Sequence, residues 1–421
     1  MSLEENYKKL GLTHNPFPLE ATEQKIIDPQ KDLLDDVSRF CVEVREREVD
    51  WINNKIIFLL KEGKRKECPN VWVSGKRGVG KSALLKYIVF SLQNTSIVPL
   101  YIKRPTQGLP EIYGETIRYL GVDFFLALSW STYSEFLKQL KTEDARFIGR
   151  NEMIKQYLLE DPSRTLLFAN PTDEALEKLK EKNLKPKDVD VKGLQKALAA
   201  WLVAKERIVL PEFAQIISVF PTGPDEQFLK LRKLPGAKMI DCLVSILQLA
   251  ERVKGYTAAL LVIDELDQVW GPLKGPQKRK LGLDARKVYE FSRGKIKLIG
   301  TSIGAEMFND FEKYEYIKDA IPTDPEHVLD VPEFDLDQTK RLISSYLKRA
   351  RPPSTEGFIE PFNETVILAL RQRHGGNARL ILQECRSLLV HGASKGHSTL
   401  DERVLIEFNP SYKELLPPIA T

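Results

Sequence analysis

The sequence has few metal-binding or redox-active side chains. Its 421 residues include five scattered histidines and four cysteines, Cys41, Cys68, Cys242 and Cys385, none of which form a C-x-x-C pair. A disulfide framework and a zinc site of the usual spacing are therefore not indicated. This cysteine usage favours a reducing, cytoplasmic compartment.

Long hydrophobic runs and a large charge imbalance are also lacking. The most hydrophobic run, 256–263, is far shorter than the roughly 20 residues that cross a bilayer, and residues 1–10 are charged with no apolar signal region. We therefore expect a cytoplasmic protein with no membrane partner. The 63 Lys and Arg against 59 Asp and Glu give a net charge of +4, which by itself does not indicate nucleic-acid binding.

Short β-favouring segments alternate with helical patterns in the middle of the chain. We predict strands at 71–73, 97–102, 259–263, 296–300 and 327–331, with helical patterns after the first strand, at 84–92, and before the third, at 239–253. Such alternation is typical of an α/β fold with a parallel sheet covered by helices on both faces.

The remaining segments are predicted to be helical. We expect a helical flank at 1–62, a nucleotide-binding core at 63–331 and a small helical lid domain at 332–421. A proline-rich helical insertion, at about 121–237, interrupts the core. Asp335, with Gln338 three residues later, has the spacing of a capping box and predicts where the first lid helix begins.

A glycine-rich motif follows the first predicted strand. Residues 75–82 read GKRGVGKS and match G-x-x-x-x-G-K-[ST] at every fixed position. Its glycines let backbone N–H groups face phosphates, and the next helix points its positive end at them. The strand-loop-helix context favours a phosphate loop over a chance turn, and the absence of N-K-x-D favours ATP over GTP. The predicted ATP-binding residues are Gly75, Lys76, Arg77, Gly78, Val79, Gly80, Lys81, Ser82 and Ala83.

Acidic residues end the third predicted strand. Asp264 and Glu265 follow an apolar run, and carboxylates at the end of a parallel strand can hold Mg²⁺ and polarise water. We predict that Ser82 and Asp264 bind Mg²⁺ and that Glu265 is the general base. The alternative role, capping the next helix, suits Asp267 better.

Hydroxyl residues end the fourth predicted strand. Thr301 and Ser302 are the last residues of this segment, and a hydroxyl there would lie beside the γ-phosphate. The alternative is a pair of solvated turn residues.

These motifs together resemble the AAA+ ATPases, and within them the origin-recognition/Cdc6-type initiators and related transposition or phage-defence ATPases. The resemblance rests on the phosphate loop, IDEL at 263–266, IGTS at 299–302 and GGNAR at 375–379. It implies that Ser302, or its neighbour Thr301, is a first γ-phosphate sensor. It also implies that Arg379 is a second sensor on the lid, rather than an ordinary surface arginine. Arg47 and Glu48 resemble the family's adenine-side motif. The predicted catalytic residues are Glu265, Lys81, Ser302, Thr301 and Arg379.

The chain departs from this family at two places. Residues 311–322 read FEKYEYIKDAIP and contain no arginine where the family places an arginine finger, and only 42 residues follow Arg379, too few for a winged-helix domain. We therefore expect slow or partner-stimulated hydrolysis, in a homo- or hetero-oligomer, without origin recognition by a winged helix.

A basic segment follows the third predicted strand. Between 271 and 300 there are nine basic and two acidic residues, with Trp270 at the edge. We predict a Gly/Pro-bearing basic loop that contacts DNA phosphates through Lys274, Lys278, Arg279 and Lys280. The alternatives are a solvated charge run and a subunit contact.

The sequence therefore predicts an ATPase switch acting on DNA or on a DNA-bound complex, with a protein partner bound through the insertion. The alternative is a STAND-like signalling or scaffold NTPase, in which the nucleotide controls protein assembly and DNA plays no part. The basic segment favours the first function, and the long insertion and the missing finger suit the second.

Overall fold

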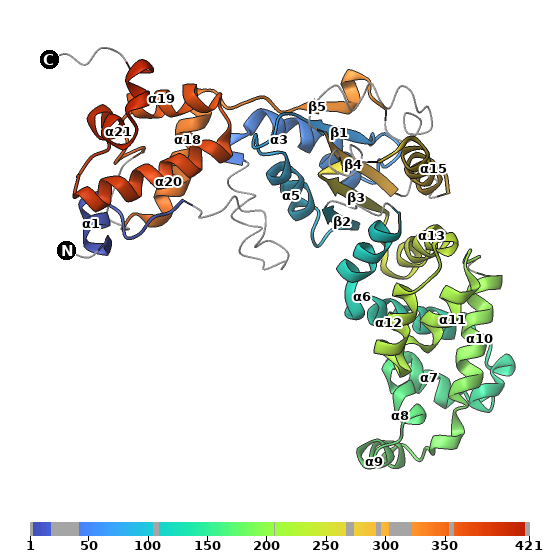
Figure 1. Ribbon diagram of the computed structural model, residues 1–421. Helices are drawn as coiled ribbons and strands as arrows, with labels where there is room; N and C mark the ends of the chain where they lie inside the picture. The colour runs from blue at the N-terminus through green and yellow to red at the C-terminus, as the bar shows by residue number, and fades with distance from the viewer. Residues whose placement is uncertain are drawn as a thin grey trace.

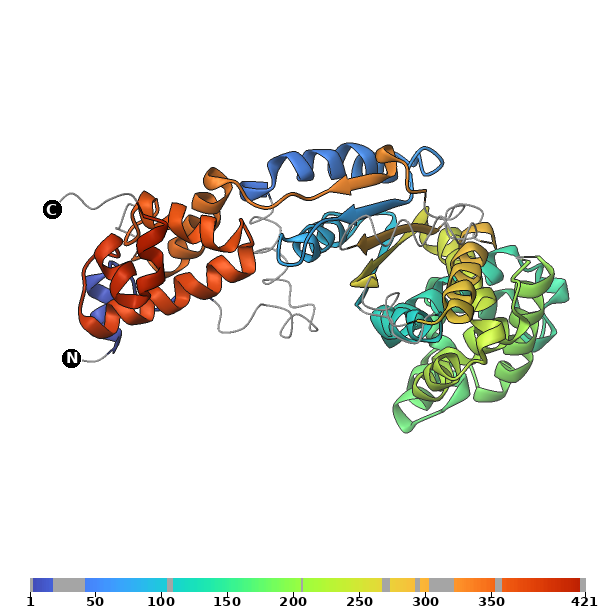
Figure 2. The same cartoon turned by 45° about the horizontal axis from the view of Figure 1, so that its top comes forward.

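The computed structural model describes residues 3–17, 42–103, 109–205, 207–266, 273–291, 296–302, 322–352 and 358–416. A parallel sheet lies in the middle of the molecule, with the C-terminal helices at one end and a separate group of helices at the other (Figures 1 and 2). No helix in these ranges is both long enough and apolar enough to span a membrane.

The sheet has five parallel strands in the order β2-β3-β4-β1-β5. Its strands are β1 (Val71–Ser74), β2 (Ile97–Lys103), β3 (Ala258–Asp264), β4 (Ile296–Ser302) and β5 (Val328–Asp330). The strands β1, β3 and β4 are buried along their whole length, as expected for a sheet covered on both faces. The predicted α/β class with a parallel sheet is confirmed.

The central strand β4 lies between β1 and β3. Gly300 of β4 pairs with Trp72 of β1, and a Cβ atom at position 300 would overlap the Trp72 ring. This register brings the carboxyl ends of β1, β3 and β4 to one edge of the sheet, where ligands bind in open parallel sheets.

Two layers of helices cover the sheet. On one face, α3 (Glu46–Ile52), a π-helical turn η1 (Asn53–Ile57) and α4 (Phe58–Lys61) form one helical stretch. They share a buried cluster with α5 (Lys81–Ser91) and with Val73 and Val262 of the sheet. On the other face, Trp72 and Leu261 pack with Ile112 of α6 (Leu109–Gln139).

The chain between β2 and β3 is helical and has its own buried core. It begins with α6, which is interrupted at Gly121 (φ 72°), and ends with α13 (Gly236–Lys254). Pro211 and Pro224 stand at the first position of their helices, where a missing N–H costs nothing. The helices between are α7 (Glu152–Glu160), α8 (Thr165–Ala169), α9 (Asp173–Glu181), α10 (Val191–Ala204), α11 (Pro211–Val219) and α12 (Pro224–Arg232).

The C-terminal helices form a second separate core. They are α18 (Leu336–Ala350), α19 (Glu364–His374), α20 (Ala378–Lys395) and α21 (Glu402–Phe408). Asp335 and Gln338 form the predicted capping box at the start of α18. The N-terminal α1 (Leu3–Lys9) lies against α20 (Figure 1), and Tyr7 belongs to the same core.

The predicted basic loop after the third strand is wrong for residues 275–291. The chain forms a helix there, α15 (Gly275–Phe291), followed by β4. Gly275 and Pro276 indicated a loop, but both lie in the first turn of the helix, where proline is well tolerated.

Candidate nucleotide site

The glycine-rich loop connects β1 to α5 at the carboxyl edge of the sheet, between residues 74 and 81. Gly75 and Gly78 have positive φ angles of 149° and 80°. A side chain on Gly75 would collide with the carbonyl of Val331, and one on Gly78 would collide with the Asn377 side chain. The loop therefore needs glycine both for its backbone conformation and for its close neighbours.

Lys81 begins α5 and its side chain lies over the loop. Its Nζ donates to the carbonyl oxygens of Gly75 (2.5 Å) and Lys76 (2.8 Å). Ser82 follows in the first turn of α5, at the positive end of the helix dipole. A cation, a hydroxyl and N–H groups at a helix start form an arrangement suited to an anionic phosphate chain.

The acidic residues Asp264 and Glu265 lie at the end of β3 and are almost completely buried. The Asp264 carboxylate accepts hydrogen bonds through Oδ2 from the Tyr101 hydroxyl (2.6 Å) and through Oδ1 from the Glu265 backbone N–H (2.9 Å). Tyr101 comes from the neighbouring strand β2. These bonds fix the direction of the Asp264 carboxylate.

Glu265 adopts a left-handed backbone conformation with φ 56°, which costs a residue with a side chain roughly 1–2 kcal/mol. Its N–H also donates to the Thr301 hydroxyl (2.7 Å), which helps to hold this conformation. Its carboxylate lies 3.8 Å from the Lys103 ammonium at the end of β2. Glu265 therefore has a neighbour on each of two strands, Lys103 on β2 at its carboxylate and Thr301 on β4 at its backbone.

The two hydroxyls at the end of β4 differ in their partners. The Thr301 hydroxyl is bonded to the Glu265 N–H and lies 3.4 Å from Asp264 Oδ1. The Ser302 hydroxyl is fully buried and has no hydrogen-bond partner among the described residues. Ser302 is paired in register with Ser74, directly before the glycine-rich loop. A buried unbonded hydroxyl at this edge has unused capacity to bind a ligand.

The C-terminal helices, predicted to form the lid, contact the loop through the turn that precedes α20. Asn377 caps α20, and its Nδ2 donates to the Arg77 carbonyl (2.7 Å). Arg379, the predicted second sensor, is the second residue of α20 and is partly buried. The structure therefore brings the start of this helix to the glycine-rich loop.

Sequence reasoning missed several residues at this edge, among them Tyr101, Lys103 and Arg45. The guanidinium of Arg45 donates to the Val79 carbonyl in the loop at 2.7 Å. The predicted adenine-side pair includes Arg47, which is exposed, whereas Arg45 is buried. The sequence signal for Arg45 was its position three residues before Glu48, a helical spacing at which the two side chains can pair.

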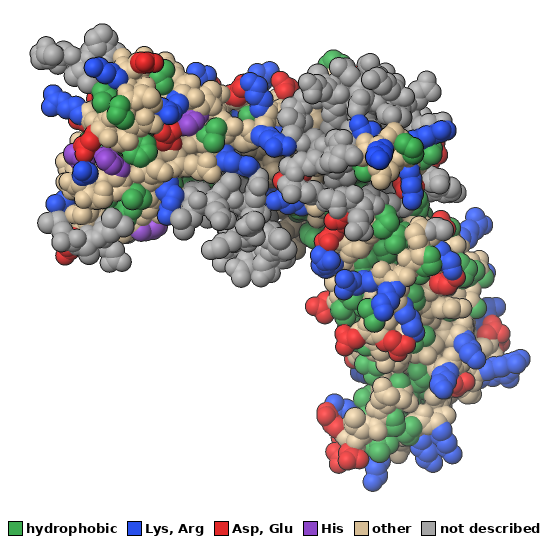
Figure 3. All heavy atoms as spheres, in the orientation of Figure 1, with side chains coloured by type: hydrophobic (Ala, Val, Ile, Leu, Met, Phe, Trp, Pro, Cys, Tyr) green, Lys and Arg blue, Asp and Glu red, His purple; other side chains and the backbone are tan. Residues whose placement is uncertain are grey.

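The basic segment separates into exposed and buried parts. Figure 3 shows Lys and Arg side chains gathered over α15, and Lys274, Arg279 and Lys280 are exposed. Lys297, counted in the predicted basic surface, instead lies buried within β4, and burial lowers its pKa. Arg293, Lys295 and Trp270 lie outside the described residues, as do residues 311–321 of the segment without an arginine finger.

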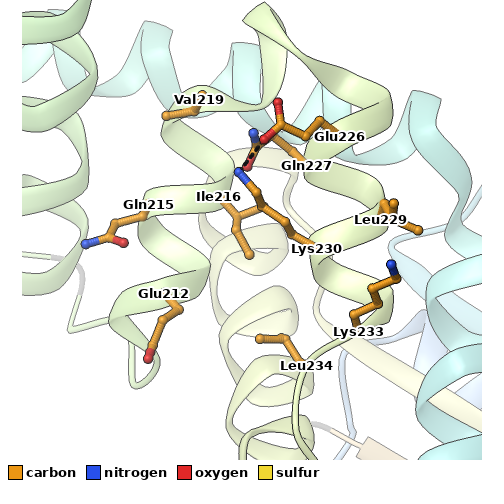
Figure 4. A pocket seen from close by; sticks show the side chains of 10 residues that line it. All are labelled: Glu212, Gln215, Ile216, Val219, Glu226, Gln227, Leu229, Lys230, Lys233 and Leu234. Carbon is orange, nitrogen blue, oxygen red and sulfur yellow. Dashed lines mark ion pairs between the residues drawn. The ribbon is translucent and has the colours of Figure 1, made fainter.

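A groove of about 670 Å³ lies in the helical insertion, between α11 and α12 (Figure 4). Its lining includes Ile216, Leu229, which is 47% exposed, and Gln227, which is 95% buried. Glu226 and Lys230 form an ion pair at its rim. None of the predicted nucleotide-site residues line this groove.

The strand order and the loop after β1 define a phosphate-loop α/β fold. Structure comparison finds similarity to Cdc6p from Pyrobaculum aerophilum, with 13% identity over 89% of this chain and 68% of that chain, and a TM-score of 0.43. It also finds the Aeropyrum pernix ORC1 protein in complex with DNA, with 12% identity over 87% of this chain and 65% of that chain, and a TM-score of 0.41.

The two similar structures bear the names of the initiator branch that the sequence motifs resemble. No protein-family model and no curated protein matches the chain.

Proposed function

We propose that this chain is an AAA+ ATPase that acts as an ATP-dependent molecular switch. The supporting observation is the meeting of three motifs at one edge of the sheet: the loop with Lys81 after β1, Asp264 and Glu265 after β3, and Ser302 at the end of β4. The loop and the start of α5 bind the phosphates, and Lys81 exchanges its loop carbonyls for phosphate oxygens.

The oxygen donors present fit Mg²⁺. The Ser82 hydroxyl and the Asp264 carboxylate would hold the ion, which takes its other ligands from phosphate and water. The described residues contain no group of three or more His, Cys, Asp or Glu side chains that could hold a metal alone. When bound, Mg²⁺ neutralises phosphate charge in the transition state.

Glu265 accepts the proton of the attacking water, and Ser302 donates a hydrogen bond at the γ-phosphate. Arg379 approaches the same phosphate from the lid. The contact of Asn377 with the loop supports this assignment, because Arg379 lies only two residues further along the chain. Hydrolysis is slow, or is stimulated by a partner or by a second subunit that supplies an arginine.

We further propose that the switch acts on DNA through the exposed cations of α15 and Lys274. A change of Lys278, Arg279 and Lys280 together to Ala should reduce the slope of log binding constant against log salt by about 2–3 for duplex DNA. The control removes the same charge from the far end of the insertion by changing Lys178, Lys180 and Lys182 to Ala, and should leave the slope unaltered. An equal slope in all three proteins would eliminate DNA contact by α15.

The alternative is a switch whose nucleotide state controls protein assembly. The groove of Figure 4 supports it, because Leu229 exposes apolar surface that a protein partner could cover. ATP turnover measured with and without duplex DNA separates the two functions. Stimulation by DNA supports the first; a rate that is flat in DNA but rises with a protein partner, and no longer does so in Leu229→Arg, supports the second.

A further inference from the structure

The segment that joins β5 to the lid follows the phosphate loop closely. The backbone N–H of Val331 donates to the Ser74 carbonyl (2.8 Å), and the Val331 carbonyl fills the space beside Gly75. Glu333 forms an ion pair with Lys76. The first half of the loop therefore lies against the linker 331–334.

The second half of the loop contacts the lid and the N-terminal flank. Asn377 bonds to the Arg77 carbonyl and occupies the space above Gly78. The next residue, Val79, gives its carbonyl to Arg45. Every residue from 74 to 79 thus touches the linker, the lid or Arg45, although these segments are far apart in the sequence.

Among the side chains that contact the loop, Arg45 is both charged and buried. Only 1% of its surface is exposed. One nitrogen, Nη2, donates both to the Val79 carbonyl and to the Pro332 carbonyl, each at 2.7 Å. The guanidinium also lies 3.9 Å from the centre of the Phe334 ring and 3.4 Å from the Glu48 carboxylate. These contacts offset the large cost of burying the charge.

A bridge through one nitrogen is sensitive to geometry. The two N–H bonds of Nη2 lie in the guanidinium plane at a fixed angle, so the guanidinium cannot follow a movement of one carbonyl without weakening its hydrogen bond to the other. Val79 stands directly before the loop residues Gly80 and Lys81, and Pro332 lies in the linker that leads to α18, the first helix of the lid. A change in the loop conformation on phosphate binding therefore alters the hydrogen bond from Arg45 to Pro332 in the linker.

We propose that Arg45 is a positioning residue that couples the phosphate loop to the lid, so that nucleotide in the loop and the position of the lid change together. This inference rests on the proposed function, because it assigns regulation to the same ATP site. Arg45 touches no reacting atom and acts through the Val79 and Pro332 carbonyls.

Arg45→Met tests this coupling by removing the donors and keeping most of the apolar length. The matched control is Arg65→Met, because Arg65 also bonds to a carbonyl, that of Thr257 (2.7 Å), and to the Glu251 carboxylate (3.1 Å), away from loop and lid. Amide hydrogen exchange is followed in residues 75–82, 331–334 and 375–382, with and without Mg-ATP. Arg45→Lys is measured alongside, so that one misfolded variant does not end the test.

Without nucleotide, the backbone amides of both the loop and the linker should exchange at least about tenfold faster in Arg45→Met than in Arg65→Met, because a charge-assisted buried hydrogen bond is lost. With Mg-ATP, wild type and Arg65→Met should gain protection in both loop and lid, whereas Arg45→Met gains it in the loop alone. Arg45→Lys should lie between them.

Equal lid protection in Arg45→Met and wild type would overturn the coupling. If wild type gains no protection from Mg-ATP, the proposed ATP function fails, and the nucleotide-free comparison still decides the coupling. In that comparison, unchanged linker exchange in Arg45→Met would refute it.

Discussion

Replacement of Glu265 by Gln removes the proton-accepting carboxylate and keeps the size of the side chain. General-base catalysis contributes about 10²–10⁴-fold to a rate, which corresponds to about 3–5 kcal/mol of activation free energy. Turnover of ATP in Glu265→Gln should fall by this factor. The backbone N–H bonds of Glu265 to Asp264 and Thr301 do not depend on its carboxylate, so the edge of the sheet should keep its structure.

Affinity and stability should change little in this variant. The carboxylate pairs with Lys103 at 3.8 Å, and the Lys103 side chain is 33% exposed, so loss of the pair costs at most about 1 kcal/mol. Single-turnover hydrolysis and equilibrium ATP binding are measured separately, with Glu212→Gln in the insertion as the control carboxylate. Wild-type hydrolysis by Glu265→Gln would refute the general-base assignment.

Three further changes test the surroundings of the site and the lid. Tyr101→Phe removes the hydroxyl bonded to Asp264 and should raise the Mg²⁺ concentration for half-maximal activity several-fold; an unaltered Mg²⁺ titration would count against the role of Asp264. Gly300→Ala forces a methyl group against Trp72 and should lower the unfolding free energy by about 1–3 kcal/mol in urea denaturation, where equal stability would contradict the register. Burial raises the pKa of Glu384, but hydrogen bonding and the nearby charges of His374 and Arg373 together outweigh this effect, and the pKa is lowered. This stabilisation is present above the ordinary carboxyl pKa and is lost as pH falls through the lowered value. The free energy of unfolding should therefore fall less with decreasing pH in Glu384→Gln than in wild type, and identical pH profiles of the two proteins would contradict the pairing.

Local sequence patterns predicted most of the elements. Apolar β-branched runs indicated all five strands, and the Asp335 capping box indicated the start of α18, because both depend on neighbours in the chain. The basic surface predicted from the charges at 271–300 was partly wrong because it also depended on local sequence alone. Local composition cannot show that Lys297 points into the core beside Cys68, whose pKa burial raises to about 11.

The residues around the phosphate loop were less predictable than the loop itself. Lys103 lies opposite Asp264 only because β2 pairs with β3 in that register, and no local pattern specifies strand order. Asn377 reaches Arg77 across 300 residues of sequence. Such contacts follow from the tertiary arrangement, so the motif predicts the phosphate loop but not the groups that hold it.

Equilibrium titration of Mg-ATP into the wild-type chain and into Lys81→Ala is the most direct test of the proposed site. Lys81 supplies the only side-chain cation within the motif's fixed positions. Saturable ATP binding by wild type, weakened at least about tenfold in Lys81→Ala by loss of charge-assisted bonds to phosphate, is the expected result. Equal affinity in both proteins, or no binding by wild type, would contradict a nucleotide site at this loop.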